Sequence, residues 1–223
     1  ADKFIFMATE SGTVKKTPLV DYSRPRANGI IAVDLKEDDK LVDVALTNGE
    51  SDIMLFSSNG KVIRFDERDV RSMGRVSRGV RGMRLPENQK IISLIIAHDE
   101  DGAILTATEF GFGKRTHLAE YRVQGRGGQG IISIQTSDRN GNVVGAVQVL
   151  DEHQIMLITD GGTLVRTPVK HVSIVGRNTQ GVKLINLTKK EKLVGLERVL
   201  EVEEDEDELE GGEETALAPD ADE

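Results

Sequence analysis

Cysteine is absent from this chain of 223 residues, and aromatic residues make up only 4% of it. Without cysteine, disulfide bonds, thiolate metal sites and a thiol nucleophile are excluded. The low aromatic content argues against a stacking platform for single-stranded nucleic acid. No apolar run approaches membrane-spanning length, and the N-terminus lacks the basic and then apolar pattern of a signal peptide. We therefore expect a cytoplasmic protein that does not contact a membrane.

The net charge of -9 conceals an uneven distribution of charge along the chain. Residues 201–223 contain thirteen Asp and Glu and no Lys or Arg. Of the 38 acidic residues, 25 therefore lie in residues 1–200 against 29 basic ones, which gives this body a net charge of +4. The acidic segment has few large apolar residues, which predicts a disordered tail over 201–223. The sequence leaves open whether that tail regulates the body or only keeps it in solution.

The body repeats one pattern four times. Each copy is an apolar, β-prone run, a turn that ends in glycine and a second short strand. The four copies are FIFMATESGTVKKTPL (4–19), DIMLFSSNGKVIRF (52–65), AILTATEFGFGKRTHL (103–118) and QIMLITDGGTLVRTPV (154–169). Their turn glycines, about fifty residues apart, are Gly12, Gly60, Gly111 and Gly162.

Each unit is predicted to contain two further strands, one after a later glycine and one at its end. The later glycines are Gly29, Gly82, Gly130 and Gly181, and runs such as IIAVDL and VKLINL follow them. A period of about fifty residues with four short strands is typical of a propeller-like blade, and blades build a core by stacking. The sequence therefore predicts an all-β pinwheel of four four-stranded antiparallel blades in an open or partial ring. The repeats are about 4–51, 52–102, 103–153 and 154–200.

A glycine-rich stretch, QGRGGQG at 124–130, matches the G-x-G-x-x-G pattern of dinucleotide-binding loops. That fingerprint requires a strand before it and a helix after it. Here the strand-like run IISIQ follows, so the pattern does not indicate a dinucleotide site. A glycine-rich loop that contains an arginine also suits contact with phosphates, because backbone N–H groups can approach them closely.

Basic residues recur at equivalent places in the four units. Four residues after each turn glycine stands a base, namely Lys16, Arg64, Arg115 or Arg166. Four residues before the later glycine stands Arg78, Arg126 or Arg177, and in the first unit that place is flanked by Arg24 and Arg26. The same connections also contain Lys15, Arg75, Arg81, Lys114 and Arg122. On stacked blades these bases are predicted to form a strip along one edge, which is the electrostatic footprint of a polyanion.

Double-stranded DNA bound through its phosphates is the partner that this strip favours. No helix is predicted in residues 1–200 that would enter the major groove, so base-specific contacts are not expected. No catalytic residues are identified, because the chain has no Ser-His-Asp order and no G-x-S-x-G elbow. The four histidines lack metal-ligand spacing, so neither a metal nor a cofactor is predicted.

Several longer runs resemble one family. The runs SIVGRNTQGVKLI (173–185), MLITDGGTLVRTPV, GVRGMRL, GAILTAT and NGNVVGAVQV are similar to the C-terminal domain of the bacterial DNA gyrase A protein. The resemblance covers nearly all of residues 1–200 and implies a β-pinwheel whose blades exchange strands and whose basic rim wraps DNA. It also implies two partners, the gyrase B protein and the rest of gyrase A. Together they form an ATP-dependent, nucleoid-associated enzyme that introduces negative supercoils, although this chain has no catalytic site of its own.

The family's full domain has more blades than the four units here, and its first blade carries the heptad Q-R-R-G-G-K-G. The stretch QGRGGQG has Gly125 and Gln129 where that heptad has bases. We interpret it as a weakened relative of the heptad, and the chain as a fragment without the N-terminal blades. Two alternatives remain open: the corresponding C-terminal domain of topoisomerase IV, and a propeller-type scaffold that binds proteins.

Overall fold

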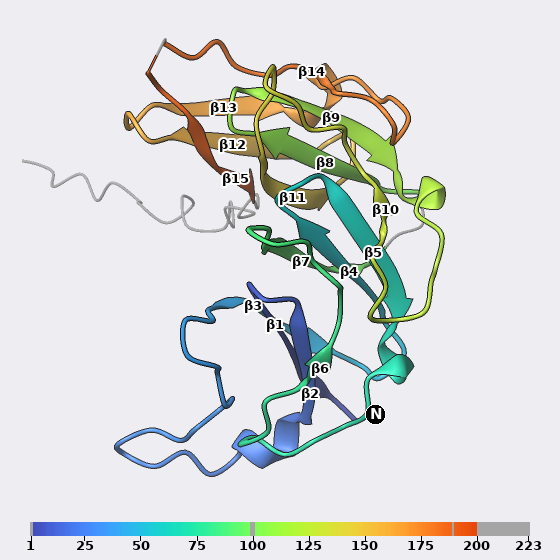
Figure 1. Ribbon diagram of the computed structural model, residues 1–223, viewed down its shortest axis with the longest axis vertical. Coiled ribbons are helices and arrows are strands. Elements are labelled where there is room, and N and C mark those ends of the chain that lie inside the picture. The colour runs from blue at the N-terminus through green and yellow to red at the C-terminus, as the bar shows by residue number, and fades with distance from the viewer. Residues whose placement is uncertain (1, 99–100, 189, 200–223) are drawn as a thin grey trace, which may run out of the picture.

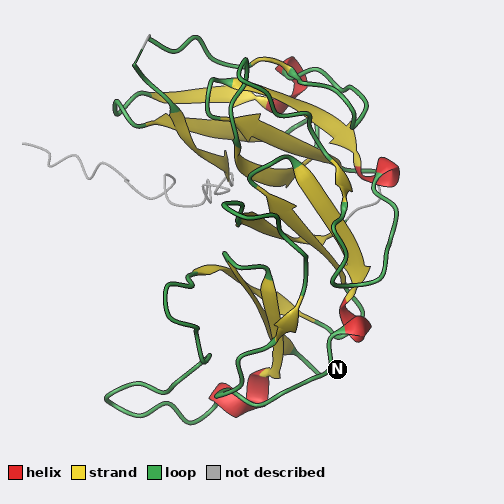
Figure 2. Cartoon of the chain, viewed as in Figure 1, coloured by secondary structure: helices red, strands yellow, loops and turns green. Residues whose placement is uncertain are grey.

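The computed structural model describes residues 2–98, 101–188 and 190–199. Strands dominate this part of the chain, and its helical elements are four 3₁₀ turns of three or four residues (Figure 2). The all-β prediction is therefore confirmed. The acidic segment 201–223, predicted to be a disordered tail, lies outside the described residues.

An antiparallel hairpin followed by a 3₁₀ turn forms the centre of each repeat. The apolar and β-branched residues of the hairpins favour a pleated, half-buried strand, and the glycine turn closes it. The hairpins are β1 (Phe4–Thr9) with β2 (Thr13–Pro18), β4 (Asp52–Ser57) with β5 (Lys61–Asp66), β8 (Ala103–Thr108) with β9 (Phe112–His117), and β12 (Gln154–Thr159) with β13 (Leu164–Pro168). The turns are η1 (Leu19–Tyr22), η2 (Glu67–Asp69), η3 (Leu118–Glu120) and η4 (Val169–His171).

Two more strands complete each of the first three sheets, and one of the two comes from the next repeat; the fourth sheet gains one strand in the described residues. The long strands β3 (Leu41–Thr47), β7 (Ile91–Ala97), β11 (Val143–Val149) and β15 (Leu193–Val199) pair with the first hairpin strand of their own repeat. The short strands β6 (Val80–Arg81), β10 (Ile131–Ile132) and β14 (Val182–Lys183) pair with β2, β5 and β9 of the preceding repeat. The resulting orders are β3-β1-β2-β6, β7-β4-β5-β10 and β11-β8-β9-β14.

The prediction of four strands per blade is right for three sheets and wrong for the fourth. In the described residues the last sheet has three strands, in the order β13-β12-β15. The run IIAVDL (30–35), predicted to be a strand, forms none. The physical reason is the exchange of strands. Each short strand pairs with the second hairpin strand of the preceding repeat, and the described residues contain no repeat before the one that holds residues 30–35.

The turn glycines are required by backbone conformation and by close packing. Gly60 has a φ of 79°, and a Cβ atom placed on it would lie 2.1 Å from the backbone oxygen of Ile134 in the next repeat. In the last repeat, Gly162 has a similar φ of 84°, but a Cβ atom there would meet nothing within 4 Å. The hairpin tip is therefore a contact surface between consecutive repeats.

The hydrophobic core lies between neighbouring sheets rather than inside one blade. One cluster joins Phe6 and Val14 of the first sheet to Leu55 and Phe65 of the second. A second cluster joins the other face of the second sheet to the third, and a further one joins the third to the fourth. The sheets accordingly follow one another in chain order along the long axis of the molecule (Figure 1). Stacking of blades thus builds the core, as the repeat pattern predicts.

Candidate nucleic-acid interface

Five of the bases predicted to bind DNA are buried. Their exposed fractions are 1% for Lys15, 6% for Lys16, 7% for Arg64, 1% for Lys114 and 5% for Arg115. The prediction that these residues lie on the exposed strip is wrong. In the first three repeats, a base three or four residues after the turn glycine lies in the second hairpin strand, which the next repeat covers, and not in a loop.

Lys16, Arg64 and Arg115 hold the 3₁₀ turn of the next repeat against their own sheet. They donate to backbone carbonyls in or beside that turn: Lys16 Nζ to Glu67 O at 3.0 Å, Arg64 Nη1 to Tyr121 O at 3.2 Å, and Arg115 Nε to Val172 O at 2.7 Å. Each charge also has a carboxylate partner, which is Glu67, Asp52 and Asp151 respectively. We call these three residues the clamp bases. Their contacts are structural.

Arg166 occupies the equivalent place in β13 but has a different environment. Its side chain is exposed, and its Nε donates to Gln154 Oε1 at 2.7 Å. In the described residues no 3₁₀ turn follows η4 that it would hold. Arg166 is therefore the member of this series that remains accessible to a ligand.

The connections between the 3₁₀ turn and the short strand contain the accessible arginines. We call residues 74–79, 125–130 and 176–181 the rim loops. Their sequences are GRVSRG, GRGGQG and GRNTQG, and each ends in a glycine with positive φ: 110° at Gly79, 72° at Gly130 and 77° at Gly181. The shared spacing G-R-x-x-x-G makes Arg75, Arg126 and Arg177 equivalent.

This register corrects one detail of the sequence interpretation. The later glycine of the second unit is Gly79 and not Gly82, so the equivalent arginine is Arg75 and not Arg78. Gly82 does not have a positive φ, and a Cβ atom on it would lie 2.6 Å from Val14 Cγ1. Position 82 therefore requires glycine because of its packing against β2, and not because of the loop conformation.

The rim loops are linked to the preceding repeat by the same contact. Arg75 donates its Nη1 to Ile31 O at 2.7 Å, Arg177 to Ile132 O at 2.7 Å, and Arg126 to Arg81 O. Backbone bonds add to this connection, as in Gly127 N to Gly82 O at 2.7 Å and Gln135 N to Thr179 O at 2.8 Å. The rim loops therefore form a continuous series along one edge of the stacked sheets.

The remaining predicted bases are partly or fully accessible. Arg75, Arg126 and Arg177 are half-buried, and the exposed members are Arg24, Arg26, Arg78, Arg81, Arg122 and Arg166. Arg78 forms an ion pair with Asp34, with Nη2 2.8 Å from Oδ2. Arg24 and Arg26 flank Pro25, which takes the place of the rim arginine in the first repeat. The structure thus brings nine of the fourteen predicted bases to accessible positions.

Two exposed bases of the same edge were missed from the sequence. Lys183 in β14 is equivalent to Arg81 in β6, and its Nζ lies 5.4 Å from the centre of the Phe112 ring. Arg84 donates its backbone N–H to Gly128 O of the next rim loop at 2.8 Å. The matching tripeptides GVR (79–81) and GVK (181–183) contain the signal that would have identified Lys183.

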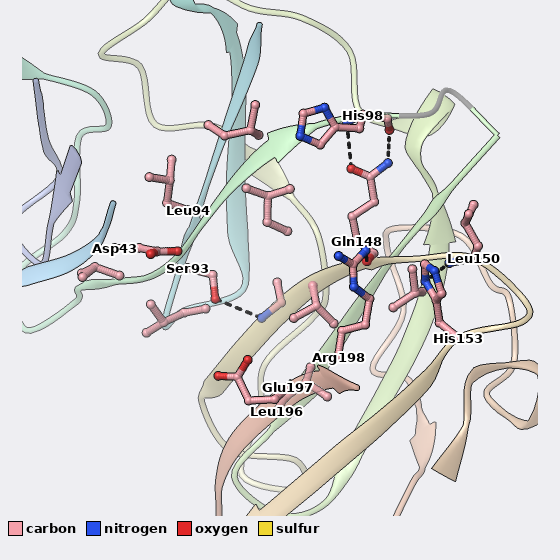
Figure 3. Close-up of a pocket in the computed structure, with 17 residues that line it drawn as sticks. Asp43, Ser93, Leu94, His98, Gln148, Leu150, His153, Leu196, Glu197 and Arg198 are labelled. Carbon is pink, nitrogen blue, oxygen red and sulfur yellow. Dashed lines mark hydrogen bonds between the residues drawn. The ribbon is translucent and has the colours of Figure 1, made fainter. Parts of the chain in front are cut away.

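A cavity of about 830 Å³ lies on another side of the molecule, between the long strands β3, β7, β11 and β15. Its polar groups mostly join neighbouring blades. His98 N donates to Gln148 Oε1 at 2.9 Å, and Ala146 N donates to Ser93 Oγ at 3.1 Å (Figure 3). The described residues contain no group of three His, Asp or Glu that would hold a metal ion. This cavity is a seam between neighbouring sheets.

Within the part of the chain that the structure describes, no helix is long and apolar enough to cross a bilayer.

Stacked sheets, three of which receive a strand from the next repeat, with arginine loops along one edge, define the β-pinwheel class of propeller-like domains. The model of one family, described as DNA gyrase C-terminal domain, beta-propeller, matches residues 3–48, 51–98, 103–149 and 153–199. The chain belongs to this family, which confirms the resemblance seen in its sequence.

Gyrase A proteins are among the relatives by sequence. The DNA gyrase A protein of Klebsiella oxytoca is 59% identical over 203 residues, which are 91% of this chain and 23% of the relative. The same protein of Pseudomonas aeruginosa is 59% identical over 215 residues, which are 96% of this chain and 23% of the relative. The chain thus spans 23% of the length of these two curated relatives.

Two solved structures share the fold. The C-terminal domain of DNA topoisomerase IV has a TM-score of 0.84 and 27% identity, with 89% of this chain and 62% of that one covered. The DNA gyrase A C-terminal domain has a TM-score of 0.80 and 24% identity, with 89% of this chain and 66% of that one covered. The identity of 59% to gyrase A proteins favours the gyrase interpretation over topoisomerase IV.

Proposed function

We propose that this chain is a non-catalytic module that binds duplex DNA through its phosphates and bends it along the rim loops. The observation that carries the proposal is the repetition of one arginine loop at three successive repeats, linked in series. Such a row of guanidinium groups matches a regularly spaced row of phosphates.

The geometry favours contact with the DNA backbone over reading of bases. The described residues contain no α-helix for the major groove, and the rim loops are short and rich in glycine. Bending a duplex site of 20–30 base pairs by 40–90° costs on the order of 1–6 kcal/mol, so several phosphate contacts must act together. A continuous series of loops supplies such contacts.

In the cell, the module serves a gyrase. Its partners are then duplex DNA, the rest of the gyrase A protein and the gyrase B protein, in the cytoplasm with the nucleoid. The ATP-dependent introduction of negative supercoils is the activity of that whole enzyme. The names of the sequence relatives support this assignment.

The removal of two rim charges tests the proposal. Arg126→Gln with Arg177→Gln takes away both guanidinium charges and keeps a side-chain donor in each place. The matched control is Arg198→Gln. Arg198 is an exposed arginine on β15 that lines the cavity between the long strands and does not belong to a rim loop. In gel shifts on duplexes of unrelated sequence, the double variant is expected to bind all of them more weakly, while the control binds as the unchanged chain does. A protein-binding scaffold would show no duplex binding in any of the three proteins.

A further inference from the structure

Two buried lysines lie directly beneath two of the rim loops. Lys15 in β2 and Lys114 in β9 both stand three residues after the turn glycine, and both are 1% exposed. Lys15 Nζ donates to Ala32 O at 2.5 Å and to Arg75 O. Lys114 Nζ donates to Gly176 O and to Arg177 O, both at 2.6 Å. Each ammonium therefore holds the main-chain carbonyl of a rim arginine itself.

Neither ammonium has a carboxylate partner at salt-bridge distance among the described residues. The charged groups that act on Lys15 are Arg75 and Asp21, and those that act on Lys114 are Glu120 and Arg177. The Tyr22 hydroxyl also donates to Ala32 O, at 3.4 Å. A buried charge without a counterion is costly, so an anion on the outer side of the loop would stabilise it.

The middle rim loop lacks this support. The residue equivalent to Lys15 and Lys114 in β5 is Ile63, which is fully buried. Its Cδ1 lies 3.8 Å from where a Cβ atom on Gly128 would stand. The loop 125–130 therefore has an apolar contact below it, and the two loops on either side have a positive charge.

We propose that Lys15 and Lys114 are positioning residues that make the rim loops 74–79 and 176–181 the two strong phosphate positions, with the loop 125–130 as a weaker contact between them. This inference rests on the proposed DNA binding. The ammonium fixes the carbonyl of the rim arginine, and the Nη1 bond to the preceding repeat fixes its side chain. The buried charge also attracts phosphate across a medium of low dielectric, where salt screens it weakly.

Because of the two lysines, fold stability is expected to rise with pH while DNA affinity falls. Burial, and then Arg75, lowers the pKa of Lys15 to about 8, and burial lowers the pKa of Lys114 to about 8. Between about 8 and the ordinary value of 10.5, the unfolded chain binds more protons than the folded one, so stability rises with pH in this window. Phosphate favours the ammonium form, so DNA affinity falls as pH rises through the same window.

The test compares the unchanged chain with Lys15→Met/Lys114→Met, which keeps two unbranched side chains and removes both charges. Dissociation constants for a random duplex and thermal unfolding are measured from about pH 7 to 9.5, with Ile63→Met as the control at the equivalent position. At pH 7 the double variant is expected to bind on the order of tenfold more weakly. Its stability is expected to have lost the rise with pH above about 8, and its affinity to have lost the fall with pH.

Each outcome decides a different claim. If the unchanged chain binds DNA and the double variant binds it equally well with the same pH profile, the lysines serve packing alone and this inference is overturned. An affinity of the unchanged chain that does not fall between about pH 7.5 and 9 also overturns it, and this measurement needs no variant. If the unchanged chain binds no duplex at any pH, the proposed function fails and the inference fails with it.

Discussion

At the scale of the residue, two constraints require glycine at the hairpin turns: a left-handed backbone conformation and close packing against the next repeat. A comparison of Gly60 with Gly162 separates the two. Gly60 and Gly162 have almost the same left-handed conformation, with φ of 79° and 84°. Only Gly60 of this pair is also pressed against a backbone oxygen of the next repeat. The left-handed conformation costs a residue with a Cβ atom about 1–2 kcal/mol, and a backbone overlap adds to this cost.

We therefore predict that Gly60→Ala destabilises the fold by about 3 kcal/mol or more, and Gly162→Ala by about 1–2 kcal/mol. The measurement is chemical unfolding of both variants. Equal losses of stability would show that packing between repeats at the hairpin tip adds nothing to the cost of the conformation.

The middle rim loop offers a gain of function at the same scale. A Cβ atom on Gly125 would meet nothing within 4 Å, no positive φ occurs there, and Gln129 is exposed. Gly125→Arg with Gln129→Lys therefore adds two accessible bases without strain. We predict affinity for duplex DNA on the order of tenfold higher at low salt, with stability changed by less than about 0.5 kcal/mol. Unchanged affinity in filter binding would remove this loop from the interface.

Sequence alone identified the rim arginines but did not separate them from the clamp bases. Arg126 and Arg177 recur with a glycine-rich loop, and Arg64 and Arg115 recur with a turn glycine. Both patterns have the same period, so both suggested one exposed strip. Burial is decided by which face of the hairpin the next repeat covers. The covered face is set by the exchange of strands between repeats, so it cannot be predicted from the sequence of a single repeat.

At the scale of the element, each hairpin is joined to the next repeat by its clamp base. Arg115 satisfies the carbonyl of Val172 at the end of η4, whereas the equivalent Arg166 bonds Gln154 on its own hairpin. Removing a buried donor leaves the carbonyl unsatisfied, at a cost of about 1–3 kcal/mol. An exposed substitution changes stability by less than about 0.5 kcal/mol.

We predict that Arg115→Met lowers the free energy of unfolding by about 1–3 kcal/mol and that Arg166→Met leaves it within about 0.5 kcal/mol of its original value. Urea denaturation of the two variants measures the difference. A loss at Arg166 as large as that at Arg115 would contradict the assignment of the clamp bases to the junctions between repeats.

The hairpins and long strands were predictable from the sequence because their signals are local. Alternating apolar runs and glycine turns placed β4, β5, β8 and β9 close to their observed bounds. The short strands were harder to place. The run after Gly130 pairs through only Ile131 and Ile132, and residues 30–35 form no strand. Whether such a run is a strand depends on a hairpin in the preceding repeat and not on its own composition.

At the scale of the whole molecule, a basic edge and an acidic terminal segment belong to one chain. Residues 201–223 contain thirteen acidic side chains and are tethered to the body, so their effective concentration near the rim reaches roughly the millimolar range. We therefore expect them to compete with DNA phosphates for the rim arginines. We predict that removing residues 201–223 tightens DNA binding, most at low salt where screening is weak.

Affinity for a random duplex, with and without these residues, measures the effect over a series of salt concentrations. Equal affinities at every salt concentration would leave the acidic segment with a role in solubility alone.

The central claim is that the rim binds duplex DNA through phosphates, whatever the sequence, and the salt dependence of affinity tests it most directly. Each phosphate contact contributes about -0.9 to the slope of log K against log salt, so about five contacts along the rim predict roughly -4 to -5. Two duplexes of equal length and unrelated sequence are expected to give the same slope and the same affinity. A slope near zero, or affinities that differ between the two sequences by more than about tenfold, would contradict the account.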